Sequence, residues 1–278
     1  MIRVAILTVW RRKASRRRAV TGRRVRGLAA SAVGMLASMI WFVPPAHAVA
    51  GGSDVPDGKY RFAAALSMPL ITRPNGSTYS SACSGALVAP SWVITAGHCL
   101  HDGARNRISG PPRYEVQVTV GRETLSGTGG ATRRVVEVRQ SSTEDVALIR
   151  LDQPVFTVLP IVIAHRAPRA GDVLRLTGWG SADAEVDLSH RPDRLQTGLV
   201  EVSSFTDTDV LVHGLAPHPT TSACPYDSGA PYFREVGGVA VLVATEAIGP
   251  DCPHDQNETA ARIDTIAPWV IGTLTGTL

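Results

Sequence analysis

Several signatures that define large protein classes are missing from this 278-residue chain. Its four cysteines are spaced 16, 125 and 28 residues apart, with no Cys-x-x-Cys pair and no paired histidines, which argues against a zinc site. The apolar stretch from about Gly27 to Val43 is shorter than the ~20 residues that span a bilayer. We find no internal repeat, heptad or low-complexity tract after residue 48, which excludes solenoid and coiled-coil architectures.

Acidic residues are absent from residues 1–48, which carry ten basic side chains. A basic region, a limited apolar region and a small-residue site ending at Ala48 are typical of a secretory signal peptide. We therefore predict that residues 1–48 are a signal peptide and that the mature protein is secreted. A single membrane anchor is the alternative, and Arg16 and Arg17 also allow a twin-arginine export signal.

Removing this leader reverses the net charge. Ten of the 28 basic residues lie in it, so 18 remain against 24 acidic residues, a net charge of −6. The basic character of the whole chain is targeting chemistry and does not indicate nucleic-acid binding. We also expect no stable membrane association once the signal is removed.

The mature chain, residues 49–278, consists of short apolar runs separated by Gly, Pro, Asp and Ser. Runs of this length, rich in Val, Ile, Leu and Thr, favour an all-β sandwich or barrel over alternating βα units. The expected strands are 61–68, 85–88, 92–95, 114–120, 133–138, 146–151, 173–177, 197–202 and 239–244. Only 259–274 has helical periodicity, and Pro268 fits that helix best in its first turn.

A histidine, an aspartate and a serine stand in contexts that suit nucleophilic catalysis. A serine hydrolase needs a hydroxyl nucleophile, an imidazole that takes its proton and a carboxylate that orients the imidazole. His98 follows an apolar strand and precedes Cys99, Asp145 precedes the apolar run 146–151, and Ser228 lies in an Asp-Ser-Gly turn. Each residue alone has an ordinary structural explanation, as a core or surface histidine, a solvated carboxylate and a turn hydroxyl.

Five segments together resemble the chymotrypsin/trypsin family of serine proteases, in its bacterial secreted type. They occur in the family's order and span residues 49 to about 272, with the His, Asp and Ser motifs as the most specific part. The segments are Cys-Ser-Gly-Ala-Leu-Val at 83–88 with Thr-Ala-Gly-His-Cys at 95–99, Glu-Asp-Val-Ala-Leu-Ile-Arg-Leu at 144–151, Gly-Trp-Gly at 178–180, Cys-Pro-Tyr-Asp-Ser-Gly-Ala-Pro at 224–231, and Arg-Ile through Trp-Val at 262–270.

The resemblance implies two packed six-stranded antiparallel β-barrels with a short C-terminal helix, and a boundary between the barrels near residues 155–190. The polar loop 182–194 is one candidate for that boundary. The triad His98, Asp145 and Ser228 would lie in the cleft. Four cysteines in an exported protein predict two disulfides in any of three pairings, and the resemblance implies Cys83 with Cys99 and Cys224 with Cys252.

Cleavage after Ala48 would give a mature chain beginning at Val49, which looks like the activated N-terminus of this family. The resemblance implies that the new amino group pairs with the buried carboxylate of Asp227 and orders the loop beside Ser228. Because we see no room for a separate propeptide, we expect export itself to activate the enzyme. The alternative is that Val49 merely begins a strand.

Two departures from the family pattern affect the nucleophile loop. The oxyanion hole implied by the resemblance uses the backbone N–H groups of Ser228 and Tyr226, and the family normally has glycine at the second position. Glycine reaches conformations that tyrosine reaches only with strain, so Tyr226 is expected to lower the rate or restrict the leaving group. Ala230 in place of a second glycine is a milder change.

The specificity pocket is the least determined part of the site. The residue at its expected base is Ser222, so the aspartate that gives trypsins their preference for Arg and Lys is missing. Glu258 falls near the pocket wall in our register and either restores attraction for basic side chains or is a surface charge. Apolar and basic substrates both remain open.

The sequence therefore predicts a serine endopeptidase with protein or peptide substrates and no metal or organic cofactor. The alternative is a secreted binding protein on the same fold, with catalysis impaired by its oxyanion loop. An α/β-hydrolase esterase is excluded because Ser228 lacks a Gly-x-Ser-x-Gly elbow and follows the histidine in the chain.

Overall fold

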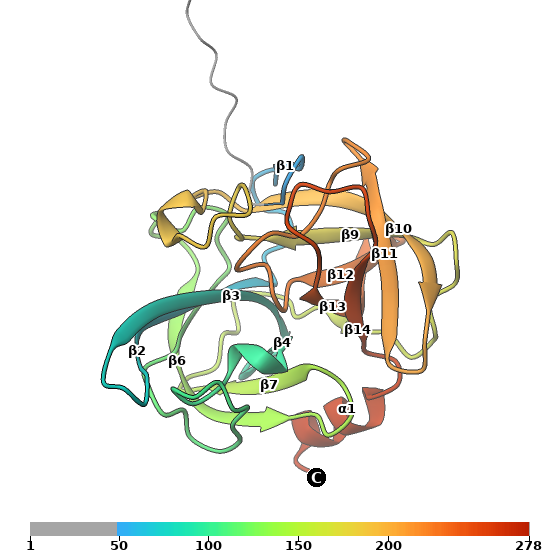
Figure 1. Cartoon of the computed structure of the whole chain (residues 1–278). Coiled ribbons are helices and arrows are strands. Elements are labelled where there is room, and N and C mark those ends of the chain that lie inside the picture. The colour runs from blue at the N-terminus through green and yellow to red at the C-terminus, as the bar shows by residue number, and fades with distance from the viewer. Residues whose placement is uncertain (1–48, 278) are drawn as a thin grey trace, which may run out of the picture. The chain divides into compact units, whose positions relative to one another are not determined.

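The structure is a computed structural model of the chain and describes residues 49–277, so the predicted signal peptide at 1–48 lies outside the described residues. The described part is built of β-strands with one α-helix, α1 (Ala267–Thr275), at its C-terminal end (Figure 1). None of the helices in residues 49–277 has the length and apolar character needed to cross a membrane.

The first barrel closes six antiparallel strands in the order β2-β3-β4-β7-β6-β5. Strand β4 is buried along its whole length, and Ile94 on it pairs with Ala86 on one side and Leu148 on the other. The strands are β2 (Ala63–Thr72), β3 (Thr78–Ala89), β4 (Trp92–Ala96), β5 (Gln117–Val120), β6 (Ala131–Gln140) and β7 (Val146–Leu151).

The second barrel closes because one strand, β9, pairs with both β10 and β12. The ring runs β9-β10-β11-β14-β13-β12, with β1 (Ser53–Asp54) added to β10 and β8 (Val162–Ile163) added in parallel to β13. Its strands are β9 (Val173–Gly178), β10 (Gln196–Phe205), β11 (Asp209–Ala216), β12 (Pro231–Val236), β13 (Val239–Ile248) and β14 (Glu258–Arg262). The predicted all-β fold of two six-stranded barrels with a short C-terminal helix is confirmed.

Aromatic side chains join the two barrels. The ring of Phe62, at the start of the first barrel, meets Phe233 of β12 edge to face with 5.2 Å between centroids. Tyr60 contacts the same ring at 5.1 Å. Edge-to-face aromatic pairs contribute to packing beyond the area that they bury, and these contacts join the two barrels.

The connection between the barrels runs from residue 152 to residue 172, after β7 and before β9. The loop 182–194 connects β9 to β10 and therefore does not separate the barrels. The helix predicted over 259–274 is wrong in its first half, because residues 258–262 form β14 between β11 and β13. Helix α1 begins at Ala267 with Pro268 in its first turn, where the missing N–H costs no helical hydrogen bond.

Candidate active site

His98 is placed at the edge of the first barrel by the strand before it. Strand β4 ends at Ala96, and a single 3-10 turn, Gly97–Cys99, carries the imidazole out of the sheet. A disulfide from Cys99 to Cys83 of β3 anchors the turn. The histidine side chain keeps 44% of its surface exposed, which leaves one edge of the ring open to a substrate.

Asp145 holds the opposite edge of the imidazole. Its Oδ2 lies 2.5 Å from His98 Nδ1, and its Oδ1 accepts a hydrogen bond from the His98 backbone N–H at 2.8 Å. Burial of the Asp145 carboxyl favours its neutral form, but the hydrogen bonds from His98 and the charge of Arg107 outweigh burial and hold its pKa below the ordinary value. The carboxylate therefore fixes both the orientation and the tautomer of the ring, with the proton on Nδ1.

Arg107 is a neighbour of this pair that the sequence analysis did not identify. Its guanidinium lies 3.8 Å from Asp145 Oδ1 and donates hydrogen bonds to the Gln140 side chain and to the carbonyl oxygens of Ser141 and Glu144. These bonds keep the arginine beside the carboxylate. No motif marks Arg107 in the sequence, because it sits in a polar loop among other charged residues.

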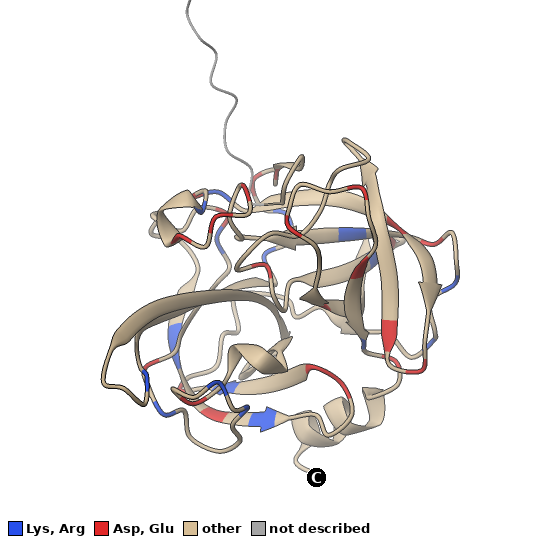
Figure 2. Ribbon diagram, in the orientation of Figure 1, with Lys and Arg blue, Asp and Glu red and all other residues tan. Residues whose placement is uncertain are grey.

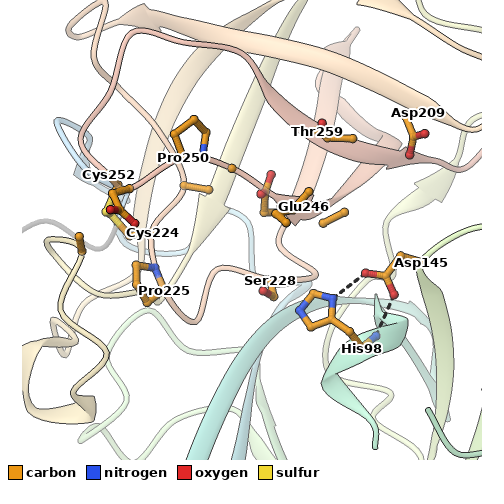
Figure 3. Close-up of a pocket in the computed structure, with 16 residues that line it drawn as sticks. His98, Asp145, Asp209, Cys224, Pro225, Ser228, Glu246, Pro250, Cys252 and Thr259 are labelled. Atoms are coloured by element: carbon orange, nitrogen blue, oxygen red, sulfur yellow. Dashed lines mark hydrogen bonds and ion pairs between the residues drawn. A yellow bond between two sulfur atoms is a disulfide. The ribbon is translucent and has the colours of Figure 1, made fainter. Parts of the chain in front are cut away.

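Ser228 comes from the second barrel and lies beside the free edge of the imidazole, on the side away from Asp145 (Figure 3). Its carbonyl accepts the backbone N–H of Ser84 at 2.9 Å, which ties the nucleophile loop to the first barrel. Gly229 has φ 83°, and a Cβ there would stand 2.3 Å from Thr95 Oγ1. Within residues 49–277 no hydrogen bond joins Ser228 to His98, a contact that often tightens only when substrate binds.

Tyr226 adopts φ 76°, the left-handed region that the family's glycine would occupy without strain. Its carbonyl accepts a hydrogen bond from Ser84 Oγ at 3.2 Å. The guanidinium carbon of Arg191 lies 5.8 Å from the centre of its ring. The substitution thus keeps the backbone conformation expected for this loop, and the tyrosine carries the conformational cost.

Asp227 is completely buried next to the Gly-Trp-Gly segment. Its carboxylate accepts the backbone N–H groups of Gly180 at 2.8 Å and Cys224 at 3.1 Å. A Cβ at Gly178 or at Gly180 would stand 2.1 or 2.3 Å from a carboxylate oxygen, so both glycines make room for Asp227. Desolvation by burial raises the Asp227 pKa to about 8, even with these two hydrogen bonds and the nearby Arg191.

Val49 is buried in the core of the second barrel. The next residue, Ala50, exchanges two backbone hydrogen bonds with Ser222, at 3.0 and 3.2 Å. In the uncleaved chain the Val49 nitrogen is a neutral peptide nitrogen, and the described residues show no contact between it and Asp227. The pairing of Val49 with Asp227 stays a prediction for the cleaved chain.

The residues expected at the specificity pocket are both buried. Ser222 and Glu258 are each 1% exposed, and neither lines the cavity at Ser228. The reading of Glu258 as a surface charge is wrong: its Oε2 accepts the backbone N–H of Ala223 at 3.0 Å and its Oε1 the hydroxyl of Tyr232. A disulfide between Cys224 and Cys252 closes this side of the pocket.

A cavity of about 640 Å³ opens between His98 and Ser228 and extends along the second barrel. Glu246 of β13 lines this cavity and was not among the site residues predicted from the sequence. One signal was present: an acidic residue within a run of apolar strand residues is unusual unless it is paired or functional. Within residues 49–277 no cluster of three or more His, Cys, Asp or Glu side chains has the arrangement of a metal site.

The family model for trypsin matches residues 49–270, which covers the barrels, the His98–Asp145 pair and the Ser228 loop. The chain belongs to the trypsin family. All four cysteines of the described residues form the two disulfides Cys83–Cys99 and Cys224–Cys252.

The individual relatives of this trypsin-family chain have low sequence identity to it. The thrombin-like enzyme ancrod-2 of Calloselasma rhodostoma is 26% identical over 227 residues, covering 74% of this chain and 81% of ancrod-2. The vitamin K-dependent protein C of Mus musculus is 28% identical over 196 residues, covering 63% of this chain. That of Rattus norvegicus is 27% identical over 200 residues, covering 63% of this chain. The matched region spans 42% of the length of each protein C.

Proposed function

We propose that this chain is a secreted serine endopeptidase that hydrolyses peptide bonds through an acyl-enzyme intermediate. The observation that carries the proposal is the 2.5 Å contact between His98 Nδ1 and Asp145 Oδ2, with Ser228 on the other side of the same ring. Two barrels contribute these residues to one cavity. Membership of the trypsin family and the protease relatives support peptide substrates.

In the proposed mechanism, His98 Nε2 takes the proton of Ser228 as its oxygen attacks the substrate carbonyl. The resulting imidazolium is stabilised by the Asp145 carboxylate and then returns the proton to the leaving amine. The Ser228 ester that remains is hydrolysed by water through the same proton transfers. A short hydrogen bond to Nδ1 is the requirement for this cycle, because the wrong tautomer leaves no base facing the serine.

Charge that develops on the substrate oxygen needs donors that are already in place. The backbone N–H groups of Ser228 and Tyr226 are the proposed oxyanion hole. Support for this assignment comes from Ser84, whose Oγ and backbone N–H bond the carbonyl groups of Tyr226 and Ser228 and so hold the peptide units of the loop. The strain at Tyr226 is the cost of that backbone conformation.

Activation in this proposal depends on cleavage before Val49. The released amino group would enter the site of Asp227, where a buried carboxylate has two hydrogen bonds but no cation within hydrogen-bonding distance among the described residues. A buried charge is costly without such a partner. Signal peptidase would make this cleavage during export, and the leader chemistry of residues 1–48 and the two disulfides support an extracellular enzyme.

Labelling of Ser228 by a phosphonofluoridate tests the proposed function. The reagent should modify the secreted protein on Ser228, and the variants S228A and H98A should remain unlabelled. N-terminal sequencing of the labelled protein should read Val49 first. A folded protein that begins at Val49 and takes up no label would reject the enzyme in favour of a binding protein on the same fold.

A further inference from the structure

The carboxyl group of Glu246 lies at a fixed position in the cavity that contains Ser228 (Figure 3). Two backbone hydrogen bonds join strand β13 to the nucleophile loop. The Glu246 carbonyl accepts the N–H of Gly229 at 2.7 Å, and the Glu246 N–H donates to the carbonyl of Ala230 at 2.9 Å. The side chain is only 4% exposed. A substrate side chain that enters the cavity from Ser228 therefore meets a carboxyl group whose distance from the nucleophile is set by the sheet.

Behind Glu246 the hydroxyl group of Tyr232 bridges two carboxyl groups. It lies 2.7 Å from Glu246 Oε2 and 2.6 Å from Glu258 Oε1. The other oxygen of Glu258 accepts the Ala223 N–H at 3.0 Å, and His254 Nε2 lies 3.6 Å from that oxygen. Tyr232, Glu246 and Glu258 come from the adjacent strands β12, β13 and β14.

Counting protons in this bridge assigns one to Glu246. The single Tyr232 proton serves one of the two short contacts, so the second contact needs a proton on a carboxyl group. Glu258 Oε2 accepts the Ala223 N–H and lies 3.6 Å from His254 Nε2, whereas the other oxygen of Glu246 has no donor among the described residues, so the negative charge is better stabilised on Glu258. Glu246 Oε2 therefore carries the second proton and donates it to the Tyr232 oxygen. Burial and the nearby charges of Glu258 and Asp227 also raise the pKa of Glu246 well above its ordinary value.

The remaining oxygen of Glu246 has no hydrogen-bond partner among the described residues. The charged groups that line the cavity with it are acidic apart from His98, namely Asp145, Asp209 and Asp251, and no Lys or Arg of residues 49–277 lines it. Figure 2 shows acidic positions on β11 and β14, the strands beside this cavity. The surroundings favour a cation.

We propose that Glu246 is a specificity-determining residue that binds the cationic side chain of an Arg or Lys preceding the cleaved bond, and that it releases its proton as the cation enters. The inference rests on the proposed function and names its substrate class. The Glu246 proton passes to solvent, the carboxylate that remains pairs with the guanidinium or ammonium group, and no covalent bond to the substrate changes. The Tyr232 hydroxyl proton is then the one proton left between the carboxyl groups of Glu246 and Glu258.

Proton release gives this pocket a pH dependence that a permanently ionised carboxylate would lack. While Glu246 is protonated in the free enzyme, each basic side chain bound displaces one proton, so its binding improves about tenfold for each pH unit. We expect the ratio of kcat/KM for a peptide with Arg to that for the same peptide with Leu to rise about tenfold per pH unit, then level off. The ratio cancels the pH dependence of the catalytic steps, which affects both peptides alike.

Binding of benzamidine, an aromatic amidinium, tests the inference without catalysis. Calorimetry of the secreted protein in buffers of different ionisation enthalpy should give about one proton released per molecule bound. E246Q keeps the shape of the side chain but has no proton to release, so benzamidine should bind about 100-fold more weakly with no proton exchange. E115Q makes the same change at an exposed site on the first barrel and should match the unaltered protein.

The outcomes separate this inference from the proposed function. Suppose that Ser228 is labelled but benzamidine either does not bind or binds without releasing a proton. That result overturns the role of Glu246 and leaves the proposed peptidase activity intact. Proton-linked benzamidine binding without labelling of Ser228 rejects the peptidase and leaves the cation site. Equal affinity of E246Q and the unaltered protein overturns the inference, and the Arg-to-Leu ratio, which needs no variant, checks it independently.

Discussion

The buried carboxyl group of Asp227 should make the uncleaved chain lose stability as the pH rises. Burial raises its pKa from 3.8 to about 8 in this state. The folded chain therefore keeps a proton that the unfolded chain releases above pH 4. The full contribution of this group is present below pH 4, is lost progressively as the pH rises, and is gone above pH 8.

The size of the effect follows from the two pKa values. The gap between 3.8 and about 8, at about 1.4 kcal/mol for each pH unit, sets a ceiling of about 6 kcal/mol. Between pH 5 and pH 8 the expected loss is about 4 kcal/mol. Cleavage before Val49 should reduce this loss, because an ammonium partner stabilises the ionised carboxylate.

Urea unfolding at pH 5, 6, 7 and 8 measures this loss. The protein carries S228A to prevent self-digestion and is prepared both with an N-terminal extension and with Val49 as its first residue. The variant D227N in each form removes the titrating group, and the difference between Asp and Asn forms cancels the contributions of the histidines. The extended form should lose about 4 kcal/mol relative to D227N, and the form that begins at Val49 less than half of that. Parallel pH curves for the extended form and its D227N variant would refute the reasoning.

Three further predictions concern the residues that shape the site. Y226G should stabilise the protein by about 1 kcal/mol in urea unfolding, because glycine adopts φ 76° without strain, whereas Y226A should show no such gain. G180A should destabilise it by about 2 kcal/mol or more, because the new Cβ would stand 2.3 Å from the Asp227 carboxylate, while G129A, which meets open space, should have little effect in the same assay. C83A/C99A should lower the free energy of unfolding by about 3 kcal/mol, since the disulfide closes a loop with a sequence separation of 16; an unchanged urea midpoint would contradict this estimate.

Local sequence pattern was sufficient for much of the first barrel. The apolar run at 92–95 became β4 (Trp92–Ala96), and the run at 146–151 became β7 with the same bounds. Both strands are buried on both faces apart from Arg150, so nearly continuous apolar sequence marks them. Strand β11 was missed although Val210 and Val212 alternate with less buried residues, because the alternation lies among Asp, Thr and His residues that indicate a loop.

Strand β14 shows where local pattern fails. Residues 258–262 precede a helical apolar repeat and were read as part of it, but pairing with β11 and β13 holds them in a strand. Strand β11 lies far from β14 along the chain, and β13 lies inside the loop that the Cys224–Cys252 disulfide closes, so no short window of sequence contains these partners. Tertiary pairing overrides local preference in such cases.

The fold class and the order of the His98, Asp145 and Ser228 segments could be predicted from the amino-acid sequence, because motifs and apolar runs are local features. The environment of the carboxyl groups could not be predicted in this way, because it depends on how the strands pack. Two glycines leave space for the buried side chain of Asp227. The hydroxyl group of Tyr232 lies between the carboxyl groups of Glu246 and Glu258, on three adjacent strands. The ionisation of a buried carboxyl group depends on the donors and charges that folding brings within a few ångströms, and residues distant in the chain supply them.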